Sequence, residues 1–152
     1  MAQQSNRSSH HLLSCTDAIA AGLHDPLLLV GRVLIAAVFL LTAWFGSPNA
    51  GYLTSLGYPN PSLMSQLAVA AEYVIIVSLI LGVATRYGAL LGLLFVIVAT
   101  VTAHRYWEFP QPQQGVQYIF LTKNLAIAGG LLVLFVTGGG RFSIDSMLAG
   151  KS

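Results

Sequence analysis

Four long apolar runs, separated by short segments rich in turn-forming residues, dominate the pattern of the chain. They cover residues 27–45, 67–84, 87–103 and 118–137. A helix needs roughly 20 mainly apolar residues to cross a bilayer, with about 17 to 25 tolerated. A membrane-spanning strand would be about ten residues long and would alternate apolar with polar positions, which these runs do not. The pattern therefore predicts an all-α integral membrane protein, a bundle of four transmembrane helices.

Turn signals refine the boundaries of these helices. Asn60 followed by Pro61 is a helix-capping residue followed by the favoured first-turn proline, so the second helix should begin near Pro61. Three glycines at 138–140 should end the fourth helix. The chain then divides into a polar N-terminal tail at 1–26 that could include a short surface helix, a four-helix domain at 27–145 and a C-terminal tail at 146–152.

Basic residues are distributed unevenly between the two sides of such a bundle. Arg7, Arg86, Arg141 and Lys151 fall on the side of the termini, whereas the opposite loops hold only Arg105. Because positive residues favour the cytoplasmic side, both termini should be cytoplasmic and the loops 46–66 and 104–117 external. Aromatic residues gather at the external boundary, as they do at membrane interfaces; these are Trp44, Tyr52, Tyr58, Tyr106, Trp107 and Tyr118.

Composition supports the membrane class and excludes others. Of the 152 residues 55% are hydrophobic and 8% charged, about a third of the usual charged fraction. The single cysteine, Cys15, excludes a disulfide scaffold, and a net charge of +2 is too small for a nucleic-acid-binding surface. The expected partner is therefore the lipid bilayer and not a nucleic acid.

Pairs of small residues four positions apart occur on two of the predicted helices and mark sites of close helix contact. They are Gly88 with Gly92, Ala99 with Ala103, and Ala126 with Gly130. Such pairs serve both packing within one bundle and association of two copies. Internal packing is the simpler interpretation, and a homodimer stays possible.

Ionisable groups at membrane depth are costly, so they are the first candidates for function. Glu72 in the second run and Lys123 in the fourth lie about 18 and 21 Å above the cytoplasmic ends of their helices, counted at about 1.5 Å per residue. The two residues are thus level, and an ion pair between them is the economical arrangement. That pair would fix the register of the helices or form part of a ligand or proton site.

Three further polar residues complete the candidate ligand-binding set of Glu72, Lys123, His104, Asn124 and Arg32. His104 should lie at the outer lip of the same region, and Asn124 is beside Lys123. Arg32 lies only about 8 Å from the cytoplasmic end of its helix, where it could instead extend to the lipid headgroups.

The sequence identifies no cofactor, no metal site and no catalytic residue. His104 and Glu108 have the spacing of two metal ligands on a helix, but one such pair does not define a site. The phosphate-binding GxxxxGK[ST] loop and a dinucleotide fingerprint after a strand do not occur.

Several motifs, in this order, resemble the DoxX family of small four-helix bacterial membrane proteins. They are Gly31-Arg32, the turn Leu56-Gly57-Tyr58-Pro59, Glu72, Thr85-Arg86, His104, Lys123-Asn124-Leu125-Ala126, Gly129-Gly130-Leu131 and the closing Gly140-Arg141-Phe142-Ser143-Ile144-Asp145. The resemblance extends from about residue 27 to 145. It implies a multi-pass protein of the bacterial inner membrane with a link to redox metabolism, because named relatives include a subunit of a thiosulfate:quinone oxidoreductase.

Three functions follow from the residues and the resemblance together. The first is a subunit or scaffold, not an enzyme on its own, that docks a redox enzyme or supports a quinone-handling complex. The second is a quinone- or ligand-binding component of an oxidoreductase, with the headgroup held by Lys123 or His104 and proton exchange through Glu72. A small transporter is the third, disfavoured because four short spans offer no inverted repeat.

Overall fold

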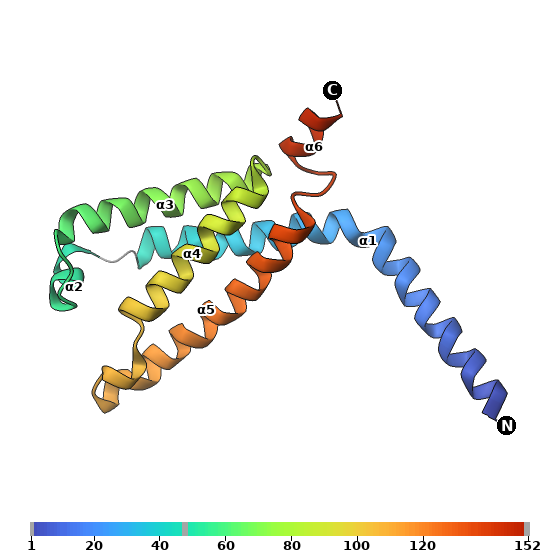
Figure 1. The fold of residues 1–152 in the computed structure, drawn as a ribbon, viewed down its shortest axis with the longest axis horizontal. Coiled ribbons are helices and arrows are strands. Elements are labelled where there is room, and N and C mark those ends of the chain that lie inside the picture. The colour runs from blue at the N-terminus through green and yellow to red at the C-terminus, as the bar shows by residue number, and fades with distance from the viewer. Residues whose placement is uncertain (1, 47–48, 151–152) are drawn as a thin grey trace.

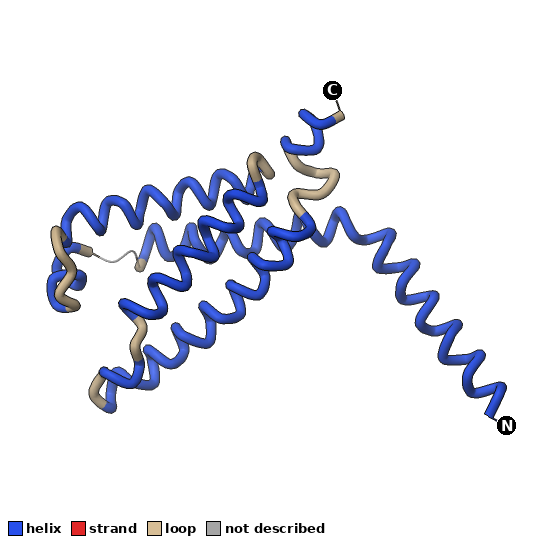
Figure 2. Tube along the Cα trace, viewed as in Figure 1, coloured by secondary structure: helices blue, strands red, loops and turns tan. Residues whose placement is uncertain are grey.

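The computed structural model describes residues 2–46 and 49–150, which form helices and connecting loops without a strand among them (Figure 2). The order is α1 (Ala2–Phe45), α2 (Ala50–Ser55), α3 (Pro61–Leu81), α4 (Thr85–Ala103), a 3₁₀ turn at Tyr106–Glu108, α5 (Gln111–Thr137) and α6 (Ile144–Ala149). Four of these helices contain a segment long and apolar enough to cross a membrane: Thr16–Phe45, Pro61–Leu81, Thr85–Glu108 and Gln111–Thr137. The predicted four-helix transmembrane bundle is confirmed.

The second half of α1 packs with α3, α4 and α5 in a closed ring (Figure 1). In this ring α1 contacts α3 and α5, and α4 contacts the same two helices from the other side. One end of the bundle carries α2 and the 3₁₀ turn, and we call it the α2 end. The opposite end carries the α3–α4 turn and the chain between α5 and α6, and we call it the clasp end.

The helices are longer than the apolar runs that predicted them. α3 begins at Pro61, directly after Asn60, and α5 begins at Gln111, seven residues ahead of its run. The polar tail predicted for residues 1–26 differs most, because α1 is continuous from Ala2 through Pro26. Ala, Leu and Gln favour helix. In Figure 1 the first half of α1 leads away from the bundle. Of the C-terminal tail, 146–149 belongs to α6, and 151–152 lie outside the described residues.

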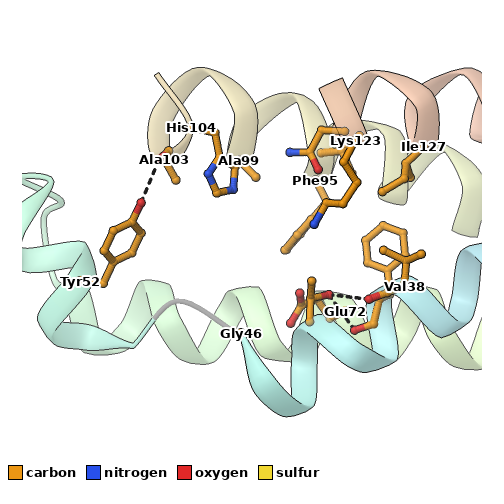
Figure 3. Close-up of a pocket in the computed structure, with 14 residues that line it drawn as sticks. Val38, Gly46, Tyr52, Glu72, Phe95, Ala99, Ala103, His104, Lys123 and Ile127 are labelled. Carbon is orange, nitrogen blue, oxygen red and sulfur yellow. Dashed lines mark hydrogen bonds between the residues drawn. The ribbon is translucent and has the colours of Figure 1, made fainter. Parts of the chain in front are cut away.

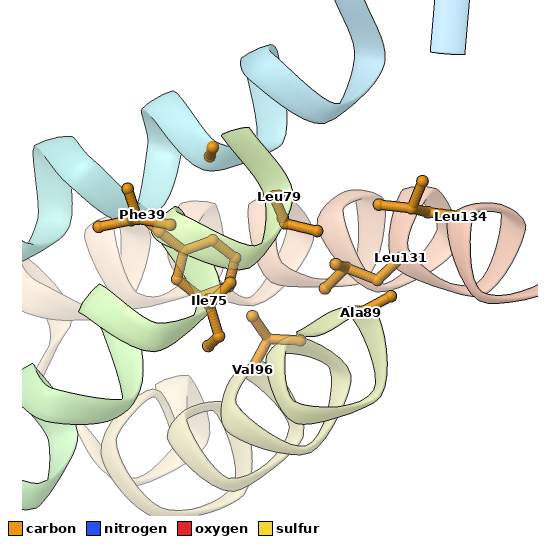
Figure 4. Close-up of a cluster of buried hydrophobic side chains, with 9 residues drawn as sticks. Phe39, Ile75, Leu79, Ala89, Val96, Leu131 and Leu134 are labelled. Carbon is orange, nitrogen blue, oxygen red and sulfur yellow. The ribbon is translucent and has the colours of Figure 1, made fainter. Parts of the chain in front are cut away.

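The hydrophobic core lies along the axis of the ring, with contributions from all four helices (Figure 4). Its buried members are Ala36, Phe39, Ile75, Ile76, Leu79, Ala89, Val96, Leu131 and Leu134. Large apolar side chains on the outer faces remain exposed, including Leu34 at 63% and Val136 at 71%. An apolar outer surface of this extent suits contact with lipid tails.

Most of the small residues of the predicted pairs pack inside this bundle. A Cβ at Gly88 would overlap the Ser78 side chain, and one at Gly92 would come within 3.2 Å of Leu131. A Cβ at Gly130 would come within 3.1 Å of Ile35. These glycines therefore set close approaches of α4 to α3, of α4 to α5 and of α5 to α1.

Candidate functional site

A cavity of about 130 Å³ lies between the four helices in the half of the bundle nearer the α2 end (Figure 3). It is lined mostly by apolar side chains, with Phe39 of α1 and Phe95 of α4 meeting edge to face at 5.8 Å between ring centroids. Four of the five candidate residues also line it: Glu72, His104, Lys123 and Asn124. A mainly apolar pocket with a few convergent polar groups is the usual form of a small-molecule site.

Glu72 and Lys123 face each other from different helices of the ring. Glu72 belongs to α3 and is 2% exposed, whereas Lys123 belongs to α5 and is half-buried. Figure 3 shows the two side chains on opposite sides of the cavity. The level heights counted along the sequence thus bring both residues to one site.

The direct ion pair expected between these two residues does not form. The ion pairs between described residues are His24 with Asp25 and Arg105 with Glu108, and Glu72 with Lys123 is not among them. The Lys123 Nζ lies 4.9 Å from the centroid of the Phe120 ring, a cation–π contact within its own helix. Because α3 and α5 are on opposite sides of the ring, with α1 and α4 between them, the cavity separates the two groups.

His104 and Asn124 are held in place by neighbouring polar side chains. The His104 Nδ1 lies 2.8 Å from the Gln117 Oε1, and the imidazole packs on Phe120 with 4.8 Å between centroids. The Asn124 Nδ2 donates to the Thr100 Oγ1 at 3.0 Å. Glu108 is directed away to Arg105, so the His104–Glu108 spacing does not produce a pair of metal ligands. No cluster of three His, Cys, Asp or Glu residues forms in the described part of the chain.

Tyr52 lines the cavity from the segment that joins α1 to α3. The side chain of Asn49 caps α2 by accepting from the Tyr52 amide at 2.8 Å, and Leu53 is buried against the bundle. The Tyr52 hydroxyl donates to the carbonyl of Ala103 at 2.9 Å, across from α2 to the end of α4. Burial raises the pKa of the Tyr52 phenol, so its proton is retained for this hydrogen bond.

The sequence alone does not indicate that Tyr52 and Thr42 line the cavity, nor that Thr100 and Gln117 contact Asn124 and His104. The sequence indicates Tyr52 only as one of several interfacial aromatic residues, and nothing in its neighbours predicts that α2 packs on the end of the bundle. Thr42 and Thr100 look like ordinary threonines within apolar runs. Their positions depend on how the helices rotate about their axes, which the spacing of the runs does not determine.

Arg32 lies at the clasp end, away from the cavity, and does not extend to the lipid headgroups as one interpretation had it. It is 1% exposed and donates from Nη1 to the carbonyl of Gly139 at 2.8 Å and from Nη2 to that of Phe142 at 2.6 Å. A Cβ at Gly82 would overlap its guanidinium, so glycine there makes room for Arg32. Arg32 therefore ties α1 to the chain between α5 and α6.

Asp145 completes this arrangement, which we call the clasp and define as Arg32, Gly82, Thr85, Gly139 and Asp145. Its carboxylate accepts from the backbone N–H groups of Ala84, the N-cap residue of α4, at 2.7 Å and of Thr85, its first residue, at 2.8 Å. Burial alone would raise the pKa of the Asp145 carboxyl. The hydrogen bonds from Thr85 and Ala84, together with the charge of Arg32, outweigh that effect and lower the pKa below its ordinary value.

The four spanning helices, the closed ring and the apolar outer surface define a multi-pass α-helical membrane protein whose internal, mainly apolar cavity contains a few polar groups. The sequence model of the DoxX family matches residues 27–105. The chain is 33% identical to the inner membrane protein YphA of Escherichia coli over 126 residues, which cover 78% of this chain and 88% of that protein. It is 30% identical to the inner membrane protein YqjF of the same organism over 133 residues, 85% of this chain and 97% of that protein. No solved structure matches the chain.

The protein therefore belongs to the DoxX family and is a multi-pass protein of the bacterial inner membrane.

Proposed function

We propose that this protein is a membrane subunit that holds a small ring-bearing ligand of the quinone type in its internal cavity, and that it is not an enzyme on its own. The observation that carries the proposal is the placement of Glu72 and Lys123 on opposite walls of one mainly apolar cavity. A cavity of about 150 Å³ lined by apolar side chains accommodates a benzene ring, so about 130 Å³ suits a single ring of similar size.

The polar groups of the cavity match a ring that carries oxygens on two opposite edges. Lys123 offers ammonium donors, and the second amide hydrogen of Asn124 is available beyond the one given to Thr100. Glu72 offers carboxylate oxygens that accept from a hydroxyl. A quinone carbonyl, or a quinol hydroxyl oxygen, would accept from Lys123, and a quinol hydroxyl on the other edge of the ring would donate to Glu72. Phe39 and Phe95 supply the apolar surface against the ring.

Purification in a mild detergent followed by solvent extraction and mass spectrometry tests this proposal. We expect a quinone at about one per chain. In nanodiscs under anaerobic conditions, Glu72→Gln and Lys123→Met should each weaken binding of benzene-1,4-diol, an unsubstituted quinol ring, at least tenfold. Glu108→Gln is the matched control, because Glu108 pairs with Arg105 outside the cavity. Absence of quinone from the wild-type protein, with no binding of the added ring, would overturn the proposal.

A docking scaffold for a redox enzyme is the second candidate, and the first half of α1 favours it. This segment leads away from the bundle in Figure 1, and the described residues 16–20 within it are exposed. A helix that the bundle does not cover can present a surface to a partner. Affinity purification at native expression level should recover a redox enzyme with the full chain and lose it when residues 2–20 are deleted. Recovery of the same partners by both forms would exclude this segment as the docking surface.

A further inference from the structure

An apolar groove runs along the outside of the bundle between α3 and α4, directly behind one wall of the cavity. Its volume is about 300 Å³, and it is lined on α3 by Met64, Leu67, Ala68 and Ala71. The α4 side extends from Leu91 to Ala103, which corresponds to about 18 Å of helix. Leu53 and Tyr58 close the groove at the α2 end. None of the described residues that line it is charged.

The groove and the cavity share three residues of α4, spaced one helical turn apart. Phe95, Ala99 and Ala103 line both. Two of these three are alanines, so over much of its length the wall between cavity and groove has no bulky side chain. Residues i, i+4 and i+8 lie in a row along a helix, and this row therefore forms the boundary between the cavity and the lipid-facing surface.

We infer that the ligand of the cavity is an amphiphile with a single apolar chain, whose ring lies in the cavity and whose chain lies in the α3–α4 groove. This inference rests on the proposed function and adds the class of ligand and its route. The groove faces the region that lipid tails fill, so such a ligand can enter sideways from the bilayer past the Ala99 side of the wall. A ligand from water would instead approach from the α2 end, where Tyr52 and His104 line the cavity.

The chemistry of the two spaces is complementary in the way an amphiphile requires. The cavity contains the charged and amide groups, Glu72, Lys123 and Asn124, that would bind polar atoms of a ring. In the groove, the Thr102 hydroxyl is already hydrogen-bonded to the carbonyl of Val98 within α4. An apolar chain placed beside Thr102 would therefore leave this hydroxyl with its partner.

Blocking the groove without touching the cavity tests the inference. Ala68 lines the groove and not the cavity, whereas its neighbour Ala70 is exposed on α3 and lines neither. Binding of benzene-1,4-diol and of the same ring with a decyl chain would be measured anaerobically in nanodiscs, with empty nanodiscs subtracted. Ala68→Phe should weaken binding of the decyl compound at least tenfold and that of the bare ring by less than twofold. Ala70→Phe should change neither.

A second measurement locates the chain directly. A decyl analogue with a photoreactive diazirine on the chain should label peptides that contain 64–71 or 91–102, and excess decyl compound should prevent the labelling. Equal affinity of wild type and Ala68→Phe for the decyl compound, or competable labelling confined to other helices, would overturn this inference alone. Failure of both compounds to bind the wild-type protein would overturn the proposed function and this inference with it. Retained binding of the bare ring shows that Ala68→Phe is folded.

Discussion

The guanidinium of Arg32 donates to the carbonyl of Gly139 at 2.8 Å, across 107 residues of sequence. A second donor of the same group contacts the carbonyl of Phe142. One side chain from the first spanning helix therefore fixes the chain that follows the last one. The clasp closes the bundle at the end opposite the cavity, so cavity and clasp can be tested independently.

Replacing Arg32 should destabilise the protein without altering the cavity. Arg32→Met removes two charge-assisted hydrogen bonds and leaves two carbonyls without their donors, which we expect to cost about 2–4 kcal/mol of unfolding free energy. Unfolding by SDS in mixed micelles, followed by circular dichroism, measures this. Arg141→Met is the control, because the Arg141 side chain is exposed in the same loop. Equal stability of both variants would show that Arg32 is not needed to hold the clasp.

The clasp should also weaken in acid because of Asp145. Its folded-state pKa is lowered, so its contribution is present above the unfolded-state value of about 4 and is lost as the pH falls through the folded-state pKa. Asp145→Ala removes the cap of α4 and should cost about 1–2 kcal/mol near neutral pH. The variant should lose less stability than wild type between pH 6 and 3.

Asp17→Ala is the matched control for this pH dependence, because Asp17 is exposed on α1. Its stability should follow the wild-type curve in thermal unfolding scans at each pH. If Asp145→Ala and wild type lose stability in parallel on acidification, Asp145 does not carry the acid sensitivity.

Two glycines should respond oppositely to the same substitution. Gly88→Ala places a methyl group on the Ser78 side chain, which is hydrogen-bonded to the carbonyl of Val83, and should destabilise the α3–α4 contact by about 1–3 kcal/mol. Gly129→Ala on α5 has nothing within 4 Å of the added carbon and should be neutral or stabilising by up to about 1 kcal/mol. The difference between the two thermal midpoints is the readout. If Gly129→Ala instead lowers both the thermal midpoint and the fraction of dimer, that face of α5 lies in a contact between two copies of the chain.

The orientation of the bundle in the membrane remains a prediction from the positive residues, with both termini and Arg86 cytoplasmic. Single cysteines at Ser55, Gln113 and Met147 in a Cys15→Ser background would report it. A membrane-impermeant thiol reagent should label intact spheroplasts at Ser55 and Gln113, and should label Met147 only after lysis. Labelling of Met147 before lysis would reverse the orientation.

Hydrophobic pattern alone determined the number of spanning helices and their order, because a bilayer imposes both a length and a composition on each span. It also brought Glu72 and Lys123 to the same height, since the rise of a helix is constant. Because an unpaired charge inside a membrane is costly, the sequence then predicts an ion pair between these two residues. The tertiary structure separated them, because which helices are neighbours in the ring, and how each is rotated, decides whether two level residues touch or face each other across a cavity.

Arg32 shows the same division between sequence and tertiary structure. The sequence gives the depth of Arg32 along the first apolar run. Its partners are the carbonyls of Gly139 and Phe142, and because every residue has a backbone carbonyl, the sequence does not indicate which ones accept. Tyr52 likewise reaches the cavity only because α2 folds back onto the bundle. The pattern of apolar residues along the sequence determines which segments lie in the lipid bilayer. The cavity, the groove and the clasp depend instead on packing between segments that are distant in the sequence.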